Sequence, residues 1–171
     1  MKRRTLPIVI VVTLVHAAAY IVYQQPDWAT EWTDQAGYQR LGAALASTGM
    51  FTRFPEAATF VPEVIRTPGY PAFVAAVYLV AGVGNQLAVA MAQALVFAGL
   101  CVLVFFLTRR AAGDRAAVVA AVLTALFPPL PYFGALVVTE LWTAFVATAA
   151  MVVCLRAVKG ADGRWRSTRK A

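Results

Sequence analysis

Four long apolar runs, each followed by a polar or basic segment, are the feature that most constrains the fold of this chain. A helix needs about 20 apolar residues to cross roughly 30 Å of hydrocarbon. The runs cover residues 6–23, 86–107, 116–134 and 136–158. Of all residues, 61% are hydrophobic and only 13% are charged, whereas about a quarter are charged in a soluble domain. The sequence therefore predicts an all-α integral membrane protein with four transmembrane helices.

The first and third runs are the least regular of the four. The first follows a basic N-terminus, as in a signal peptide, but it is too long for a signal core and no small-x-small cleavage site precedes Gln24. We expect it to be retained as a helix. The third is interrupted by the prolines at 128–131, and it can span only if it continues to about Gly134.

A fifth apolar run, residues 70–83, is too short to cross, because about 14 residues at about 1.5 Å each reach only about 21 Å. If it did cross, the basic loop at 109–115 would face outward. If it lies in the interface, all of the 15 Lys and Arg residues face the cytoplasm except Arg40, Arg53 and Arg66. We therefore expect four spans in the cytoplasmic membrane and both termini in the cytoplasm.

The net charge of +7 does not indicate nucleic-acid binding, because the basic residues cluster at the ends of apolar runs and form no continuous basic face. Cys101 and Cys154 lie inside apolar runs, so no disulfide framework is implied. A single histidine, His16, excludes a His-rich metal site. We expect His16 and Gln93 to be hydrogen-bonded to neighbouring helices. The C-terminal residues, 159–171, are predicted to form a basic cytoplasmic tail.

Residues 24–84 form the one large polar segment, predicted as an outer loop. Thr33 or Asp34 can cap a helix that continues to about Thr48, where Gly49 would end it. Its apolar stripe is Tyr38, Leu41 and Leu45, and its polar residues are Asp34, Gln35, Gln39 and Arg40. A loop with Pro55 and Pro62, a turn at 66–71 and the short apolar helix follow. Two interfacial helices are thus expected to form a lid over one end of the bundle.

Asp34 and Arg66 are the strongest candidates for chemistry in this segment. A carboxylate at the mouth of a membrane bundle can act as a general base, although Asp34 is also placed to cap its helix. Arg66 precedes a Pro-Gly-Tyr-Pro turn and can bind a phosphate or diphosphate through paired donors. The alternatives for Arg66 are contact with ordinary lipid headgroups or an ion pair with Glu63.

Three further residues are candidates for substrate binding. Tyr38 and Tyr70 are of a type that lines sugar pockets, although anchoring at the interface explains them equally well. Glu140 lies inside the fourth apolar run, where it is a candidate to assist the site or to bind a divalent metal ion. If the fourth helix instead begins near Thr139, Glu140 is a first-turn carboxylate that favours the helix dipole. No other cofactor is indicated.

Several short motifs follow one another along the chain: Asp34-Gln35-Ala36-Gly37-Tyr38, Leu41-Gly42, Gly49-Met50-Phe51, Arg66-Thr67-Pro68-Gly69-Tyr70-Pro71-Ala72-Phe73, Arg109-Arg110-Ala111-Ala112-Gly113, Phe127-Pro128-Pro129 and Thr139-Glu140. Each is weak alone, but their succession between correctly placed spans resembles the N-terminal part of the polytopic glycosyltransferases of the C superfamily. That superfamily includes the protein O-mannosyltransferases and the lipid A aminoarabinose transferases.

The resemblance implies transfer of a sugar from a polyprenyl-phosphate donor to an acceptor on the extracytoplasmic face, with inversion. Asp34 matches the family's catalytic base, and Arg66 is implied to contact the leaving phosphate. Members of the superfamily have many more spans, so the chain is expected to be a truncated version of a longer enzyme or to need further membrane subunits. The alternative is a non-catalytic four-helix accessory or assembly subunit, and a transporter is a weaker third reading.

Overall fold

The computed structural model describes residues 5–25 and 33–158, and within them the regular structure is entirely helical. The helices are α1 (Thr5–Gln24), α2 (Thr33–Thr48), α3 (Gly69–Ala81), α4 (Gln86–Leu126), α5 (Pro129–Gly134) and α6 (Glu140–Val158). This confirms the all-α prediction. The predicted basic N-terminus and the tail at 159–171 lie outside the described residues.

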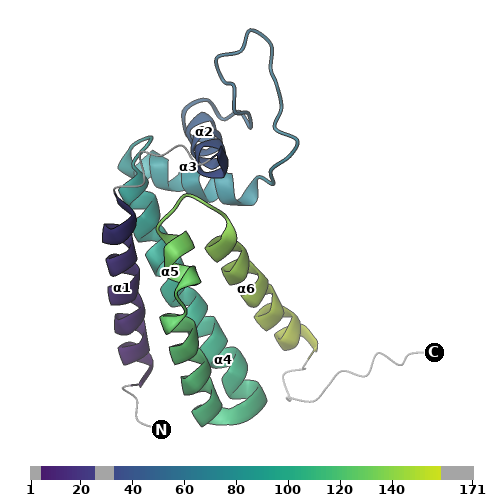
Figure 1. The fold of residues 1–171 in the computed structure, drawn as a ribbon. Coiled ribbons are helices and arrows are strands. Elements are labelled where there is room, and N and C mark those ends of the chain that lie inside the picture. Colours follow the sequence, from purple (N-terminus) through teal and green to yellow (C-terminus); the bar gives the residue numbers. More distant parts are fainter. Residues whose placement is uncertain (1–4, 26–32, 159–171) are drawn as a thin grey trace, which may run out of the picture.

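Three of the described helices are long and apolar enough to cross a membrane: α1, α4 and α6. The longest, α4, has 41 residues and is interrupted at Gly113, whose φ of 83° and ψ of −178° are not helical. The chain reverses direction there, so that α4 consists of two arms that run side by side (Figure 1). A φ and ψ of this kind are essentially restricted to glycine, which explains why the reversal falls at this residue.

The second arm of α4 together with α5 corresponds to the predicted third span, and Phe127 and Pro128 separate the two helices. Phe127 has an extended backbone, as expected for a residue that precedes proline. The predicted break is therefore present. That four segments cross the membrane stays a prediction.

The bundle core lies between α1 and the two arms of α4. Ala117, Ala121 and Ala125 recur every fourth residue and are buried, which lets the second arm approach its neighbours closely. The hydroxyl of Thr13 lies 3.5 Å from the sulfur of Cys101, and Nδ1 of His16 lies 2.8 Å from the carbonyl oxygen of Ala125. Cys101 lies on the first arm of α4 and Ala125 on the second, and they are equally far along the chain from Gly113. α1 therefore contacts both arms at about the same distance from the reversal.

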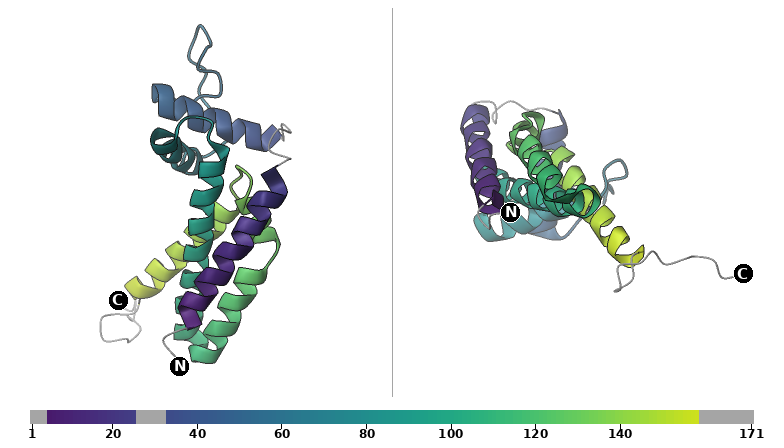
Figure 2. Two further views of the ribbon diagram at one scale, coloured as in Figure 1. Left: turned by 90° about the vertical axis from the view of Figure 1, so that its left-hand side faces the viewer. Right: turned by 90° about the horizontal axis from the view of Figure 1, so that it is seen from below.

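The two short helices α2 and α3 lie across one end of the bundle and do not run along it (Figure 2). The predicted end of α2 at Thr48 is confirmed: Gly49 follows it with a φ of 72°, and its N–H donates to the carbonyl of Leu45. The helices pack where Gly42 meets Val74. Tyr70, Val74 and Tyr78 of α3 form a second apolar cluster with Val89 and Val137.

At the opposite end of the bundle lie the beginning of α1, the reversal at Gly113 and the end of α6 (Figures 1 and 2). The basic residues 109, 110, 115 and 156 flank that reversal or end α6. This arrangement agrees with the grouping of basic segments expected from the sequence. Which side of the membrane each end faces stays a prediction.

Candidate functional site

Asp34 and Arg66, which are 32 residues apart in the chain, are in direct contact. Nη2 of Arg66 donates to Oδ1 of Asp34 at 2.8 Å. The side chain of Arg66 is only 11% exposed, whereas that of Asp34 is 79% exposed. Since α2 begins at Thr33, Asp34 lies within the first turn and is not the capping residue. Its carboxylate is therefore open to solvent on one side and held by a guanidinium on the other.

The guanidinium of Arg66 is fixed by the surface of α2. It lies over the ring of Tyr38, with its central carbon 5.1 Å from the ring centroid, a distance at which a cation is attracted to an aromatic face. It also lies directly against Gly37, where an added Cβ would be only 2.7 Å from that carbon. Gly37 thus makes room for Arg66, and Tyr38 supports it from the adjoining turn.

Glu63 fixes the loop that leads to Arg66. The alternative considered from the sequence, an ion pair between the side chains of Glu63 and Arg66, is wrong. Oε1 of Glu63 accepts from the backbone N–H groups of Ile65 and Arg66, and its other oxygen pairs with Arg53. Burial of the carboxyl alone would raise its pKa, but these two N–H groups and the charge of Arg53 outweigh that effect and lower it. Arg66 is consequently free to pair with Asp34.

Tyr70 does not line an open pocket, because it is only 2% exposed. Its hydroxyl donates to Oε1 of Gln93 at 3.1 Å. Burial raises the pKa of Tyr70 well above its usual value, with smaller contributions from Tyr78 and Glu140. The hydroxyl therefore stays protonated and remains a donor. The ring packs edge-on against Tyr38, with 5.2 Å between the centroids, which connects Tyr70 to the support of Arg66.

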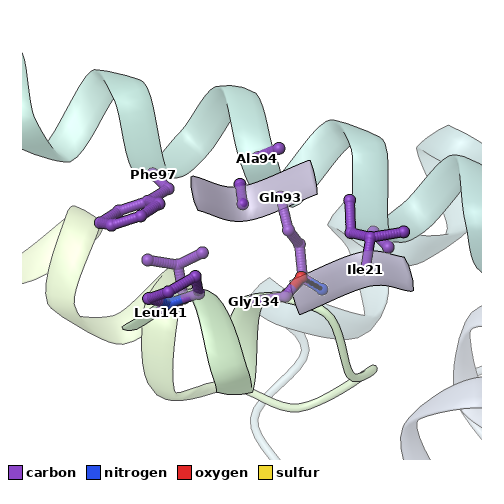
Figure 3. A pocket seen from close by; sticks show the side chains of 9 residues that line it. Ile21, Gln93, Ala94, Phe97, Gly134 and Leu141 are labelled. Carbon is purple, nitrogen blue, oxygen red and sulfur yellow. Dashed lines mark hydrogen bonds between the residues drawn. The ribbon is translucent and has the colours of Figure 1, made fainter. Parts of the chain in front are cut away.

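Gln93 is the centre of a buried polar network, as its predicted bonding to a neighbouring helix suggested. It reaches from α4 toward Gly134, and its Nε2 donates to the carbonyls of Gly134 at 3.0 Å and Leu136 at 2.7 Å (Figure 3). The hollow beside it, lined also by Phe97 and Leu141, is too small to hold a water molecule. The partners of Gln93 are therefore protein groups.

Gln35 is a functional candidate that the sequence reasoning missed. It was placed on the polar face of its helix, but it is only 2% exposed, and its Oε1 accepts from the N–H of Val137 at 3.1 Å. The helical periodicity could have predicted the burial of Gln35, because Gln35 precedes Tyr38 by three residues and therefore lies on the same apolar stripe.

Glu140 is the first residue of α6, which agrees with the alternative in which it lies in the first helical turn. It is exposed. Among the residues that the structure describes, no group of three His, Cys, Asp or Glu side chains could hold a metal ion. Glu140 lies near Tyr70 and contributes to raising the pKa of its hydroxyl.

A family model for dolichyl-phosphate-mannose-protein mannosyltransferases matches residues 65–168. The match includes Arg66, α3, α4, α5 and α6, and it begins after α2 and Asp34. Comparison with curated proteins gave no match, and comparison with solved structures gave none either. The matched region covers well over half of the chain, so the protein belongs to the dolichyl-phosphate-mannose-protein mannosyltransferase family, a family of the glycosyltransferase C superfamily.

Proposed function

We propose that this chain forms the catalytic end of a membrane glycosyltransferase that moves a sugar from a polyprenyl-phosphate carrier to an acceptor hydroxyl on the extracytoplasmic face. Asp34 is the general base in this proposal, and Arg66 binds the phosphate of the donor. The observation that carries it is the contact between these two residues. They come from separate segments, and together they offer one proton acceptor and one anion-binding group at a single place.

The proposed step uses both groups. The carboxylate of Asp34 takes the proton from the acceptor hydroxyl while the acceptor oxygen forms a bond to the anomeric carbon of the sugar. The bond between that carbon and the phosphate oxygen breaks, its electron pair leaves with the polyprenyl phosphate, and the configuration inverts. The negative charge that develops on the leaving oxygen is stabilised by the guanidinium of Arg66.

The environment of the pair suits these roles. Asp34 is open to solvent on one side, so an acceptor can approach its free oxygen. Arg66 is largely buried and held against Gly37 and Tyr38, so its position is fixed before the substrate arrives. Its planar group can bind two phosphate oxygens at once.

The test is Asp34→Asn, measured as transfer from polyprenyl-phosphate mannose in membranes that contain the protein. The amide cannot accept the proton, and we expect the transfer rate to fall by about 100-fold to 10,000-fold. Asp114→Asn is the matched control, because Asp114 forms a similar ion pair with Arg109, 2.7 Å long, at the other end of the bundle. It should leave transfer unchanged.

A normal transfer rate in the Asp34→Asn protein, at an unchanged amount in the membrane, would contradict the assignment of Asp34. If Arg66→Gln also left transfer unchanged, and the protein co-purified with another membrane protein, the accessory-subunit alternative would be supported instead.

A further inference from the structure

Both members of the Asp34–Arg66 pair are followed closely in the chain by a buried polar residue that bonds to the bundle. Gln35, the next residue after Asp34, accepts from the N–H of Val137. Tyr70, four residues after Arg66, donates to Gln93. The two anchoring bonds meet at one short stretch, residues 134–137, which joins α5 to α6 and is buried.

Gln93 holds residues 134–137 in a fixed conformation. Both amide hydrogens of its Nε2 are directed to carbonyl groups, those of Gly134 and Leu136, while its Oε1 accepts from Tyr70. The orientation of the side chain is therefore fully determined by its partners. With these two carbonyls held, the N–H of Val137 is presented to Gln35 from a backbone that cannot turn freely. In a dry, tightly packed site, it would also cost free energy to leave any of these polar groups without a hydrogen-bond partner.

The bond to Gln35 determines where Asp34 points. Neighbouring residues in a helix are about 100° apart around its axis, with about 3.6 residues per turn. When Gln35 is fixed toward the bundle, the first turn of α2 cannot rotate, and Asp34 must remain on the solvent side beside Arg66. The exposures agree, since Gln35 is 2% exposed and the side chain of Asp34 is 79% exposed.

We propose that Gln35, Tyr70 and Gln93 are positioning residues that hold the Asp34 carboxylate and the Arg66 guanidinium at their working separation by fastening α2 and α3 to residues 134–137. This role rests on the proposed function, because the separation of the pair matters for activity only if the pair carries out sugar transfer. None of the three residues contacts the substrate in this scheme, and all three act through the pair.

Three variants of α2 test the proposal in the full chain, in membranes. Gln35→Met keeps the length and removes the acceptor for the Val137 N–H. Gln35→Glu keeps an acceptor at the same place. Gln39→Met is the control, because it makes the same chemical change at a partly exposed position of the same helix. Two quantities are measured: amide hydrogen exchange in peptides covering 33–38 and 134–138, and the kinetics of transfer from polyprenyl-phosphate mannose.

We expect Gln35→Met to exchange faster in both peptides, while peptides from the core of α4 keep native protection and show that the protein is folded. Its kcat should fall by about tenfold to a hundredfold, since a displacement of about 1 Å has effects of this size. Its KM for the donor should stay within about twofold, because a positioning residue contributes little to substrate binding. Gln35→Glu should recover most of both losses, and Gln39→Met should behave as the native protein.

Unchanged exchange in the Gln35→Met protein would overturn the proposal, as would native kcat despite faster exchange. Failure of the proposed function has a different signature: the Asp34→Asn protein would transfer sugar at the native rate. The positioning role in transfer would then fall too, while the exchange data would still decide whether Gln35 fastens α2.

Discussion

At the scale of single residues, the outer segment contains two ion pairs, Arg66–Asp34 and Arg53–Glu63. The sequence singled out Asp34 and Arg66 and gave Glu63 as one possible partner of Arg66, but it did not reveal which acid pairs with which arginine. The choice depends on the conformation of a long loop, which local propensity does not determine. In the structure, Glu63 fixes that conformation by accepting two backbone N–H groups.

Glu63 should make the stability of the protein depend on pH. Its pKa is lowered in the folded state, so its stabilisation is present above the pKa of an unfolded glutamate, about 4.3, and is lost as the pH falls through the lower folded value. At pH 7 we expect Glu63→Gln to lower the free energy of unfolding by about 1 to 2 kcal/mol. The measurement compares the thermal midpoints of both proteins in detergent from pH 7 to pH 3.

The difference between the native and Glu63→Gln proteins should shrink only in the acidic part of this range. Glu56→Gln serves as the control, because Glu56 is exposed. A difference that is constant with pH would show that Glu63 acts through its shape and not through its charge.

At the scale of helices, the sequence predicted elements best where glycine or proline punctuates the pattern. The end of α2 at Gly49 and the break before α5 at Pro128 are both where they were expected. Of the two predicted beginnings of α6, residue 136 is too early, because it assigned the apolar residues Leu136 and Val137 to a span, and the alternative near Thr139 agrees with the structure. These two apolar residues are in fact held outside the helix by Gln93 and Gln35, and hydropathy carries no information about such long-range hydrogen bonds.

Substitution of Gly42 tests how closely the two surface helices pack, because Gly42 lies where α2 meets α3. A Cβ there would be 2.5 Å from Cγ1 of Val74, a fully buried residue. Alanine in a helix interior would gain about 0.5–1 kcal/mol over glycine, but overpacking costs about 1–3 kcal/mol. We therefore expect Gly42→Ala to lower the thermal midpoint, and Val74→Ala combined with it to recover part of the loss.

Hydrogen exchange in α2 and α3 should rise together in the Gly42→Ala protein, because one contact has been forced open. A higher thermal midpoint for Gly42→Ala would mean that helix propensity outweighs the contact, and the close approach of the two helices would be contradicted.

At the scale of the whole molecule, the Asp, Glu, Lys and Arg side chains of the described residues gather at the two ends of an apolar bundle. The paired Arg53, Glu63, Asp34 and Arg66 belong to the end covered by α2 and α3, and the Arg109–Asp114 pair flanks the opposite reversal. Between the ends, large apolar side chains such as Val11, Val15, Leu95 and Leu123 are exposed. This distribution suits a bundle surrounded by lipid, where buried charge is costly.

The sidedness of the membrane decides whether the site can meet an extracytoplasmic acceptor, and it can be measured with two cysteines. Ser47 is exposed on α2 and Ala112 is exposed beside the Gly113 reversal. With the exposed Cys154 changed to serine and the buried Cys101 retained, a membrane-impermeant maleimide should label Ser47→Cys in intact cells. It should label Ala112→Cys only after the cells are permeabilised, because the basic residues around the reversal favour the cytoplasm. Equal labelling of both after permeabilisation controls for reactivity. Labelling of Ala112→Cys alone in intact cells would place Asp34 and Arg66 on the cytoplasmic face, and an extracytoplasmic acceptor could not reach them.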